Sequence, residues 1–302
     1  MKDFIILSDE EKSKLTNEEL IIYYKKLKDF YLLKKHKISI NKFQNFIHPV
    51  LLKSVKLLRK FDIKIIGKNT IPKEEPLIFA LNHSNSHDFP TASEVVKEHC
   101  YLLAGKENLN LITKILFYLN GVIFVRRKDK QNRSQAKTKL IDHLYKGDNV
   151  LIFPEGTWNL SENKIMLPLN WGIIDVSIKT GVPIIPIIME YTDDGCYVNI
   201  GEKFIPNLSE TKKEQIGQLS DIMASLRWEI WEQLPTIDDS KKQKDQYKKN
   251  IDKVLKEYPK LDYSFEQTII RKTADNYDEV FDHLKHLSYT KNNAFLLGKY
   301  NH

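Results

Sequence analysis

The alternation of apolar and polar positions divides the chain, and its middle part has the most regular pattern. Between about residues 62 and 206, short apolar runs rich in β-branched residues alternate with segments of helical period. The apolar runs are 62–66, 77–81, 121–125, 150–153, 183–189 and 197–200. Nearly continuous apolar strands that alternate with helices are typical of a parallel sheet buried on both faces. The sequence therefore predicts an α/β fold, with a mostly parallel central sheet flanked by helices.

The segments on either side of this middle part are predicted to be helical. Residues 1–61 form a helical N-terminal segment, in which apolar side chains between Phe43 and Leu58 recur at helical spacing among lysines. This pattern fits a helix on a membrane surface, and it also fits a helix packed on the protein core. Residues 62–235 form the predicted α/β domain, which ends in a long helix before Pro235. Residues 236–302 form a predicted helical C-terminal extension.

Composition limits the class of protein. At 302 residues the chain has room for one domain of ordinary size with appendages. It has no run of 18 apolar residues, and the apolar core of its first ten residues is too short for a signal peptide. We therefore predict neither a transmembrane helix nor a secretory leader. Cys100 and Cys196 lie far apart and are predicted to be buried thiols in a reducing cytoplasm.

The arginines are more informative than the net charge of +7. Lysine is abundant together with asparagine and isoleucine, a general bias that raises the charge without any function, so we predict no nucleic-acid partner. Arginine occurs only six times, yet Arg126, Arg127 and Arg133 lie within eight positions of one another. The planar guanidinium group suits bidentate binding of phosphate or carboxylate. The cluster predicts an anion site, although a pair of surface arginines fits the same pattern.

The strongest candidate for chemistry follows the apolar run 76–81. His83 is followed five positions later by Asp88, which suits the first turn of a helix. A histidine at a strand end can act as a general base, and a carboxylate on its second ring nitrogen would orient it. A buried histidine beside an ordinary helix cap fits these residues equally well. Metal binding by His83, His87 and Asp88 is a further reading, but no other ligand cluster follows at suitable spacing, so we predict no metal site.

Two further motifs follow predicted strands. The strand 121–125 ends in two arginines, and the strand 150–153 leads into Phe-Pro-Glu-Gly-Thr at 153–157. Glu155 could accept hydrogen bonds from a polyol or hold an arginine, while a solvent-facing glutamate on an ordinary turn is the alternative. In parallel sheets, functional side chains collect just past the carboxyl ends of the strands. His83, Arg126 and Glu155 all lie at such ends.

These motifs, with Val-Pro-Ile-Ile-Pro at 182–186, resemble the four sequence blocks of the glycerophospholipid acyltransferase family. That family includes the 1-acylglycerol-3-phosphate acyltransferases. Its first block is a histidine, four residues and an aspartate, matched by His83 and Asp88. Its second block is matched at 121–127 and its third at 153–157. The resemblance covers about residues 62–206, and the four blocks occur in the family's order.

The resemblance implies an O-acyltransferase that moves a fatty acyl group from acyl-CoA or acyl carrier protein to the hydroxyl of a lysophospholipid. The expected acceptor is 1-acylglycerol-3-phosphate, and the product is phosphatidic acid. By resemblance, the expected catalytic residues are His83, as general base, and Asp88. The residues expected to bind the phosphorylated acceptor are Arg126, Arg127, Glu155, Gly156 and Thr157. No metal and no tightly held cofactor is implied, because the acyl thioester is a co-substrate.

The resemblance also implies a cytoplasmic enzyme, peripherally associated with the inner face of the cell membrane through its N-terminal segment. Two positions depart from the family pattern: Trp158 stands where the third block usually continues with arginine, and Arg126 stands where the second block usually has Asp or Asn. These departures leave two alternatives open. One is an acyltransferase for a different lipid or carbohydrate hydroxyl, and the other is a non-catalytic lipid-binding protein on the same fold.

Overall fold

The computed structural model describes most of residues 42–234 and parts of both ends. The described ranges are 42–67, 70–73, 75–105, 111–126, 129–159, 165–192 and 194–234. Further described residues are 7, 9–16, 18–20, 22–23, 25–27, 249, 253 and 256. Arg127 and almost all of the predicted extension 236–302 lie outside these residues.

A sheet of seven strands forms the centre of the described part of the chain, in the order β1-β7-β6-β2-β5-β3-β4. The strands are β1 (Ile63–Ile66), β2 (Ile78–Leu81), β3 (Cys100–Gly105), β4 (Ile123–Val125), β5 (Asn149–Ile152), β6 (Ile184–Thr192) and β7 (Gly195–Ile200). Neighbouring strands run parallel, except that β6 and β7 form an antiparallel pair. The predicted α/β fold with a mostly parallel sheet is therefore confirmed.

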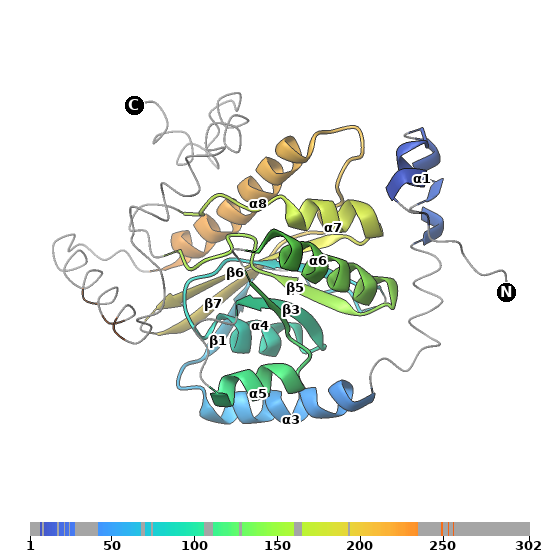
Figure 1. The fold of residues 1–302 in the computed structure, drawn as a ribbon. Helices are drawn as coiled ribbons and strands as arrows, with labels where there is room; N and C mark the ends of the chain where they lie inside the picture. The colour runs from blue at the N-terminus through green and yellow to red at the C-terminus, as the bar shows by residue number, and fades with distance from the viewer. Residues whose placement is uncertain are drawn as a thin grey trace.

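Helices cover both faces of the sheet, as Figure 1 shows. The helices of one face are α6 (Lys130–Tyr145), α7 (Gly172–Thr180) and α8 (Lys212–Gln233). The opposite face carries α4 (Asp88–Val96), with α5 (Leu111–Leu119) and α3 (Lys42–Leu58) beyond it. The short helix α1 (Asp9–Ser13) precedes Tyr23 and Leu27, which pack near Tyr145 at the end of α6.

Strand β2 anchors the core because its side chains reach both faces of the sheet. Ile78 and Ala80 pack in the apolar cluster under α6, α7 and α8, whereas Phe79 and Leu81 pack in the cluster that includes α4. All four are completely buried. This alternation is the ordinary geometry of a strand buried on both faces. It fixes the rotation of β2, and with it the direction in which the chain leaves the strand.

Strand β6 contains a proline, Pro186, although proline in a strand usually indicates an edge position. This strand lies inside the sheet, between β7 and β2. The carbonyl of Pro186 accepts from the Gly201 amide, just beyond the end of β7, so the missing N–H falls where the pairing with β7 stops. Gly201 leaves room for the ring, because a Cβ there would lie 2.6 Å from Pro186 Cγ. The proline is thus accommodated without an edge position.

Strand β3 was not predicted from the sequence. Its first half, Cys100 to Leu102, is buried between β5 and β4, but its second half ends in Ala104 and Gly105, which have low strand propensity. The run is also short and follows α4 almost directly. Only the pairing with β5 and β4 makes it a strand.

Helix α3 has a buried side and an exposed apolar side. His48 is buried, and its Nδ1 lies 3.0 Å from Asn120 Oδ1, just after α5. Phe46 and Leu57 are 71% and 85% exposed. One side of α3 therefore contacts the segment that follows α5, while the other side is not covered by the described residues. Within those residues, no helix is long and apolar enough to cross a bilayer.

We predict that Thr211→Ala destabilises the protein by about 1 kcal/mol, because Thr211 caps helix α8. Its hydroxyl accepts from the Glu214 amide, and Glu214 bonds back to the Thr211 amide, which completes a capping box. Urea unfolding measures the change. The matched control is Thr138→Ala, which removes an exposed hydroxyl from the middle of α6. Equal stability of the two variants would contradict the capping role.

Candidate active site

The side chain of Asn82 ends strand β2 and sets the position of His83. Asn82 Nδ2 donates to the Met189 carbonyl at 2.9 Å, and its Oδ1 accepts from the Met189 amide at 2.7 Å. Both bonds are buried, and Asn82 is 1% exposed. The amide group thus takes the place of a backbone pair with β6, so the chain can leave the sheet without unpaired buried groups. His83 follows directly at the carboxyl end of β2.

His83 and Asp88 lie in contact, as the spacing predicts. His83 Nδ1 is 2.7 Å from Asp88 Oδ2. Asp88 begins helix α4 and its side chain is completely buried, whereas the His83 side chain is 18% exposed. Negative charge is favourable at the N-terminal end of a helix. The pair therefore has a buried carboxylate behind an imidazole that is partly open to solvent.

The bonds of Asp88 determine the tautomer of His83. Asp88 Oδ2 also accepts from the amides of Ser84 and Asn85, at 2.6 and 2.9 Å. A carboxylate oxygen that accepts these N–H donors acts as an acceptor toward His83 as well, so Nδ1 carries the proton. The lone pair then lies on Nε2, on the opposite side of the ring. This is the arrangement that general-base catalysis requires.

Glu155 lies behind His83 and is completely buried. Its Oε1 accepts from the His83 amide at 2.9 Å, and its Oε2 accepts from the Leu167 amide at 2.8 Å. The reading of Glu155 as a solvent-facing residue is therefore wrong. Strands β2 and β5 are neighbours, so the residues that follow them meet at one edge of the sheet. The expected contact of Glu155 with the acceptor stays a prediction.

The loop after β5 forms the predicted tight turn. The Gly156 amide donates to the Phe153 carbonyl at 3.0 Å, and Gly156 has a φ of +68°. A Cβ at this position would lie 2.7 Å from Asn170 Nδ2. Thr157 follows on the same loop and is half-buried. The Asn159 amide then donates to the His83 carbonyl at 2.6 Å, so the loop holds the main chain of His83 from both sides.

Two aromatic side chains of this loop enclose the imidazole. Phe153 stacks on the His83 ring with the centroids 4.3 Å apart, and Trp158 meets the same ring edge-on at 5.9 Å. These contacts restrict the rotation of the ring. Trp158, which departs from the family pattern, therefore belongs to the immediate surroundings of His83.

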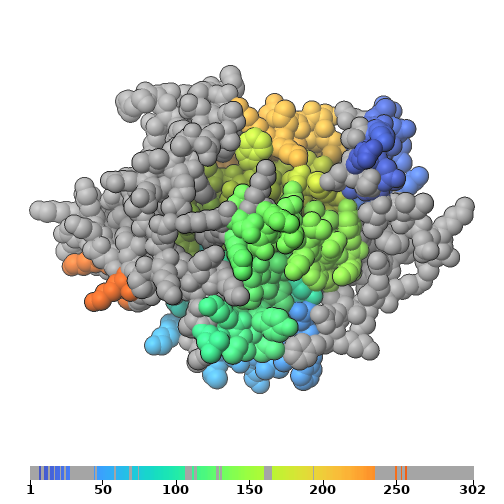
Figure 2. Space-filling model, viewed as in Figure 1, coloured from blue at the N-terminus to red at the C-terminus, as the bar shows by residue number. Residues whose placement is uncertain are grey.

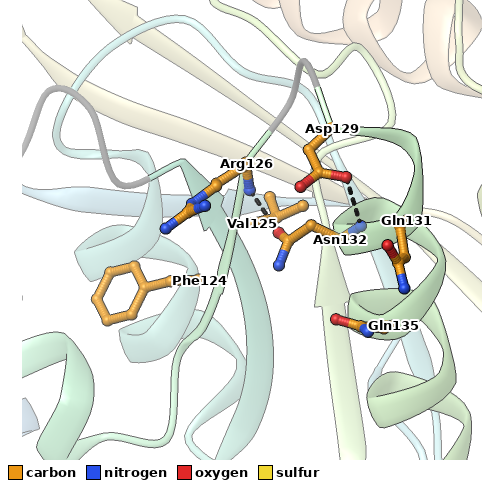
Figure 3. Close-up of a pocket in the computed structure, with 7 residues that line it drawn as sticks. All are labelled: Phe124, Val125, Arg126, Asp129, Gln131, Asn132 and Gln135. Carbon is orange, nitrogen blue, oxygen red and sulfur yellow. Dashed lines mark hydrogen bonds between the residues drawn. The ribbon is translucent and has the colours of Figure 1, made fainter.

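Arg126 lies at the same edge of the sheet but on the outermost strand, β4. It is exposed and lines an open pocket of about 440 Å³. The pocket is lined by Phe124, Val125, Arg126, Asp129, Gln131, Asn132 and Gln135. In Figure 3 the Arg126 guanidinium and the Phe124 ring extend to one side, and the polar side chains of α6 lie on the other. His83 does not line this pocket, and Arg127 lies outside the described residues.

Cys100 and Cys196 are buried thiols, as predicted. Burial, together with the nearby charge of Asp88, raises the pKa of the Cys196 thiol to about 12. It is therefore protonated near neutral pH and a poor nucleophile. Within the described part of the chain, no group of three or more His, Cys, Asp or Glu side chains could hold a metal ion.

Sequence reasoning missed three residues that support the site. Asn82 and Asn159 fix the main chain of His83, and Arg227 of α8 contacts the Ile165 carbonyl, which also accepts from Asn159. Asn82 directly precedes the histidine, which was a usable signal. Arg227 lies outside all four sequence blocks, so the rarity of arginine in this chain was the only signal that pointed to it.

Comparison with known proteins extends these observations. Residues 62–190 match the family model described as Acyltransferase. The mouse 1-acyl-sn-glycerol-3-phosphate acyltransferase alpha is 31% identical over 147 residues, which are 48% of this chain and 51% of that protein. The 1-acyl-sn-glycerol-3-phosphate acyltransferase of Escherichia coli is 29% identical over 154 residues, with 47% and 62% covered. The chain spans about half the length of the curated relatives it matches.

Among solved structures, the fold is similar to that of PlsC from Thermotoga maritima, a 1-acyl-sn-glycerophosphate (LPA) acyltransferase. The TM-score is 0.50 at 19% sequence identity, and the match covers 73% of this chain and 98% of that chain. At this identity the likeness concerns the fold alone. It agrees with the predicted α/β architecture.

We predict that Gly156→Ala destabilises the protein by about 1–2 kcal/mol or more, because a side chain is strained at this positive φ and meets Asn170. Gly172→Ala is the matched control, since a Cβ at this first position of α7 meets nothing within 4 Å. Thermal or urea unfolding compares the two variants. The turn would not require glycine if both variants were as stable as the wild type.

Proposed function

We propose that this chain, whose residues 62–190 match the acyltransferase family model, is an O-acyltransferase that converts 1-acylglycerol-3-phosphate into phosphatidic acid. The observation that carries the proposal is the pair His83 and Asp88, in which a buried carboxylate binds Nδ1 of an imidazole that is partly open to solvent. The mouse and E. coli relatives are 1-acyl-sn-glycerol-3-phosphate acyltransferases, which supports the choice of acceptor.

The proposed reaction is a direct transfer without an acyl-enzyme. His83 Nε2 removes the proton from the acceptor hydroxyl while the hydroxyl oxygen attacks the thioester carbonyl carbon. The new C–O bond forms and the C–S bond breaks, and the imidazolium returns its proton to the departing thiolate. Asp88 stabilises the imidazolium and keeps the ring oriented, since it accepts from Nδ1 throughout.

The tetrahedral intermediate requires a donor for its oxyanion. The Gly156 amide is already used in the turn with Phe153. We therefore assign the oxyanion to the next amide of the same loop, that of Thr157. The loop is held in place by Glu155 and Asn159, so such a donor is oriented before the substrate binds.

We assign the phosphate of the acceptor to Arg126 together with Arg127. Strand β4 is three strands away from β2, roughly 14 Å at the usual strand spacing, so the arginine side chains would have to extend toward His83. The amide side chains of the Arg126 pocket, Gln131, Asn132 and Gln135, offer hydrogen bonds to a polar head group. Gly156 and Thr157 would contact the glycerol part. Glu155 acts in this proposal through the main chain of His83.

The acyl donor is acyl-CoA or an acyl carrier protein, and we propose neither a metal nor a bound cofactor. The carbonyl carbon of a thioester is reactive enough for attack by an activated hydroxyl. The chain supplies the base, the orientation and the oxyanion donor. Each of the two donors ends in the same thiol, so the choice between them depends on surfaces away from His83.

We propose that helices α3 and α5 contact the membrane surface on the cytoplasmic side. They lie next to one another at the lower edge of Figures 1 and 2. Both carry exposed apolar side chains, which are Phe46, Val50, Leu57, Leu111, Ile115, Leu116 and Tyr118. Exposed lysines of α3, Lys53 and Lys56, complement anionic lipid.

We predict that His83→Ala lowers thioester turnover by about 10²–10⁴-fold, the usual contribution of a general base. The assay follows thiol release from acyl-CoA and from acyl carrier protein with a panel of lysolipids. His87→Ala, which changes an exposed histidine four positions away, is the matched control and should keep its activity. Wild-type turnover in His83→Ala would refute the role of His83 as the general base. Lipid binding by the wild type without turnover of any donor would favour a lipid-binding protein.

We predict that Phe46→Ser and Leu57→Ser each weaken binding to anionic liposomes by about tenfold, because burying such a side chain contributes about 1.5–3 kcal/mol. Liposome sedimentation measures the affinity. Ile205→Ser is the matched control, since Ile205 is 67% exposed on a segment away from both helices. If all three variants bind alike, the membrane contact lies elsewhere on the chain.

A further inference from the structure

Arg227 is a buried charge that the proposed chemistry does not use. It lies on α8, outside the segment that matches the acyltransferase family, and its side chain is 11% exposed. In the part of the chain that the structure describes, one lysine and one arginine are buried, Lys12 and Arg227. A buried charge is costly unless it is paired and hydrogen-bonded, so the contacts of Arg227 matter.

These contacts connect α8 to the loop that holds His83. Arg227 Nη1 donates to the Ile165 carbonyl, which also accepts from Asn159 Nδ2 at 3.4 Å. The Asn159 amide in turn donates to the His83 carbonyl. Two residues after Ile165, the Leu167 amide donates to Glu155, which accepts from the His83 amide. The Ile165 carbonyl is therefore connected to His83 in two ways, through Asn159 and through Leu167 with Glu155. Arg227 binds this carbonyl.

Arg227 also brings a positive charge to a region with three carboxylates. Asp88 and Glu155 are completely buried, and the Glu190 side chain is 18% exposed. Its Nε donates to Glu190 Oε2 at 2.6 Å, and Glu190 lies on β6, next to β2. Burial lowers the pKa of the Arg227 guanidinium, but the charges of Glu190, Glu155 and Asp88 outweigh this and raise it above its ordinary value. Arg227 thus brings a positive charge close to the carboxylates of Glu155 and Asp88 behind His83.

We propose that Arg227 is a positioning residue for His83, acting through the Ile165 carbonyl and through its charge beside the buried carboxylates. This proposal rests on the proposed acyl transfer, in which His83 is the base. Arg227 touches neither substrate. It holds the loop that fixes the main chain of His83, and it offsets the negative field of Asp88, Glu155 and Glu190 at the imidazole.

Two substitutions separate the geometric part from the electrostatic part. Arg227→Lys keeps the charge but loses the planar fork that reaches Glu190 and Ile165 together, so kcat should fall by about tenfold or more with little change in KM. Arg227→Met removes the charge at similar length. The imidazole of His83 should then stay protonated to a higher pH, and the acid limb of the kcat profile should move up by about half a pH unit or more.

The matched control is Arg59→Met. Arg59 Nε lies 3.1 Å from Glu94, and the Arg59 side chain is 15% exposed, so this variant loses an ion pair of similar burial that includes neither Glu190 nor the Ile165 carbonyl. Steady-state kinetics are measured against pH for all variants.

NMR of protein labelled with ¹⁵N-histidine follows the His83 imidazole directly, with His83→Ala to identify its signal. In Arg227→Lys, the Nδ1 proton of His83 should exchange faster with solvent at an unchanged titration midpoint.

The NMR readout keeps this test separate from the test of the function. If the wild type turns over no thioester, the proposed function fails, while the His83 signals still decide the role of Arg227. A folded Arg227→Met with the same His83 midpoint as Arg59→Met would overturn the electrostatic part. Wild-type kcat and wild-type Nδ1 exchange in Arg227→Lys would overturn the positioning role, even if Arg227→Met does not fold.

Discussion

The burial of two carboxylates, Asp88 and Glu155, is the constraint on which the rest of the site depends. Removing an ionised group from water costs several kcal/mol unless hydrogen bonds or an opposite charge compensate for it. Asp88 accepts from His83 and from two backbone amides, and Glu155 accepts from two backbone amides in different segments. Any conformation that moved the loops apart would leave a buried charge without partners.

The parallel sheet makes this compensation possible. Strands β2 and β5 are neighbours and run in the same direction, so the chain leaves both at one edge. The segment after β2 supplies the imidazole, and the segment after β5 supplies Glu155 and the amide that binds the His83 carbonyl. Phe153 and Trp158 then restrict the ring from two sides. Each of the two loops therefore supplies hydrogen-bond partners for the other.

The compensation of the buried carboxylates also involves a residue outside the segment that matches the acyltransferase family. Arg227 on α8 contacts Glu190 and the Ile165 carbonyl, although it lies outside residues 62–190. The long helix that packs on β6 and β7 is therefore a functional part of the proposed enzyme and also part of its core. A domain boundary drawn from sequence blocks alone would separate Arg227 from the histidine that it supports.

The sequence by itself determined the fold class, the strands that carry His83, Arg126 and Glu155, and the contact of His83 with Asp88. These features follow from local apolar runs and from short spacings, which a single sequence records. Tertiary structure decided that Glu155 is buried behind His83, that β6 lies inside the sheet despite Pro186, and that Arg227 reaches the site. Each of these depends on which distant segment supplies a partner for a buried polar group. That choice is made by packing, because no local pattern records where a carbonyl or carboxylate far along the chain will lie.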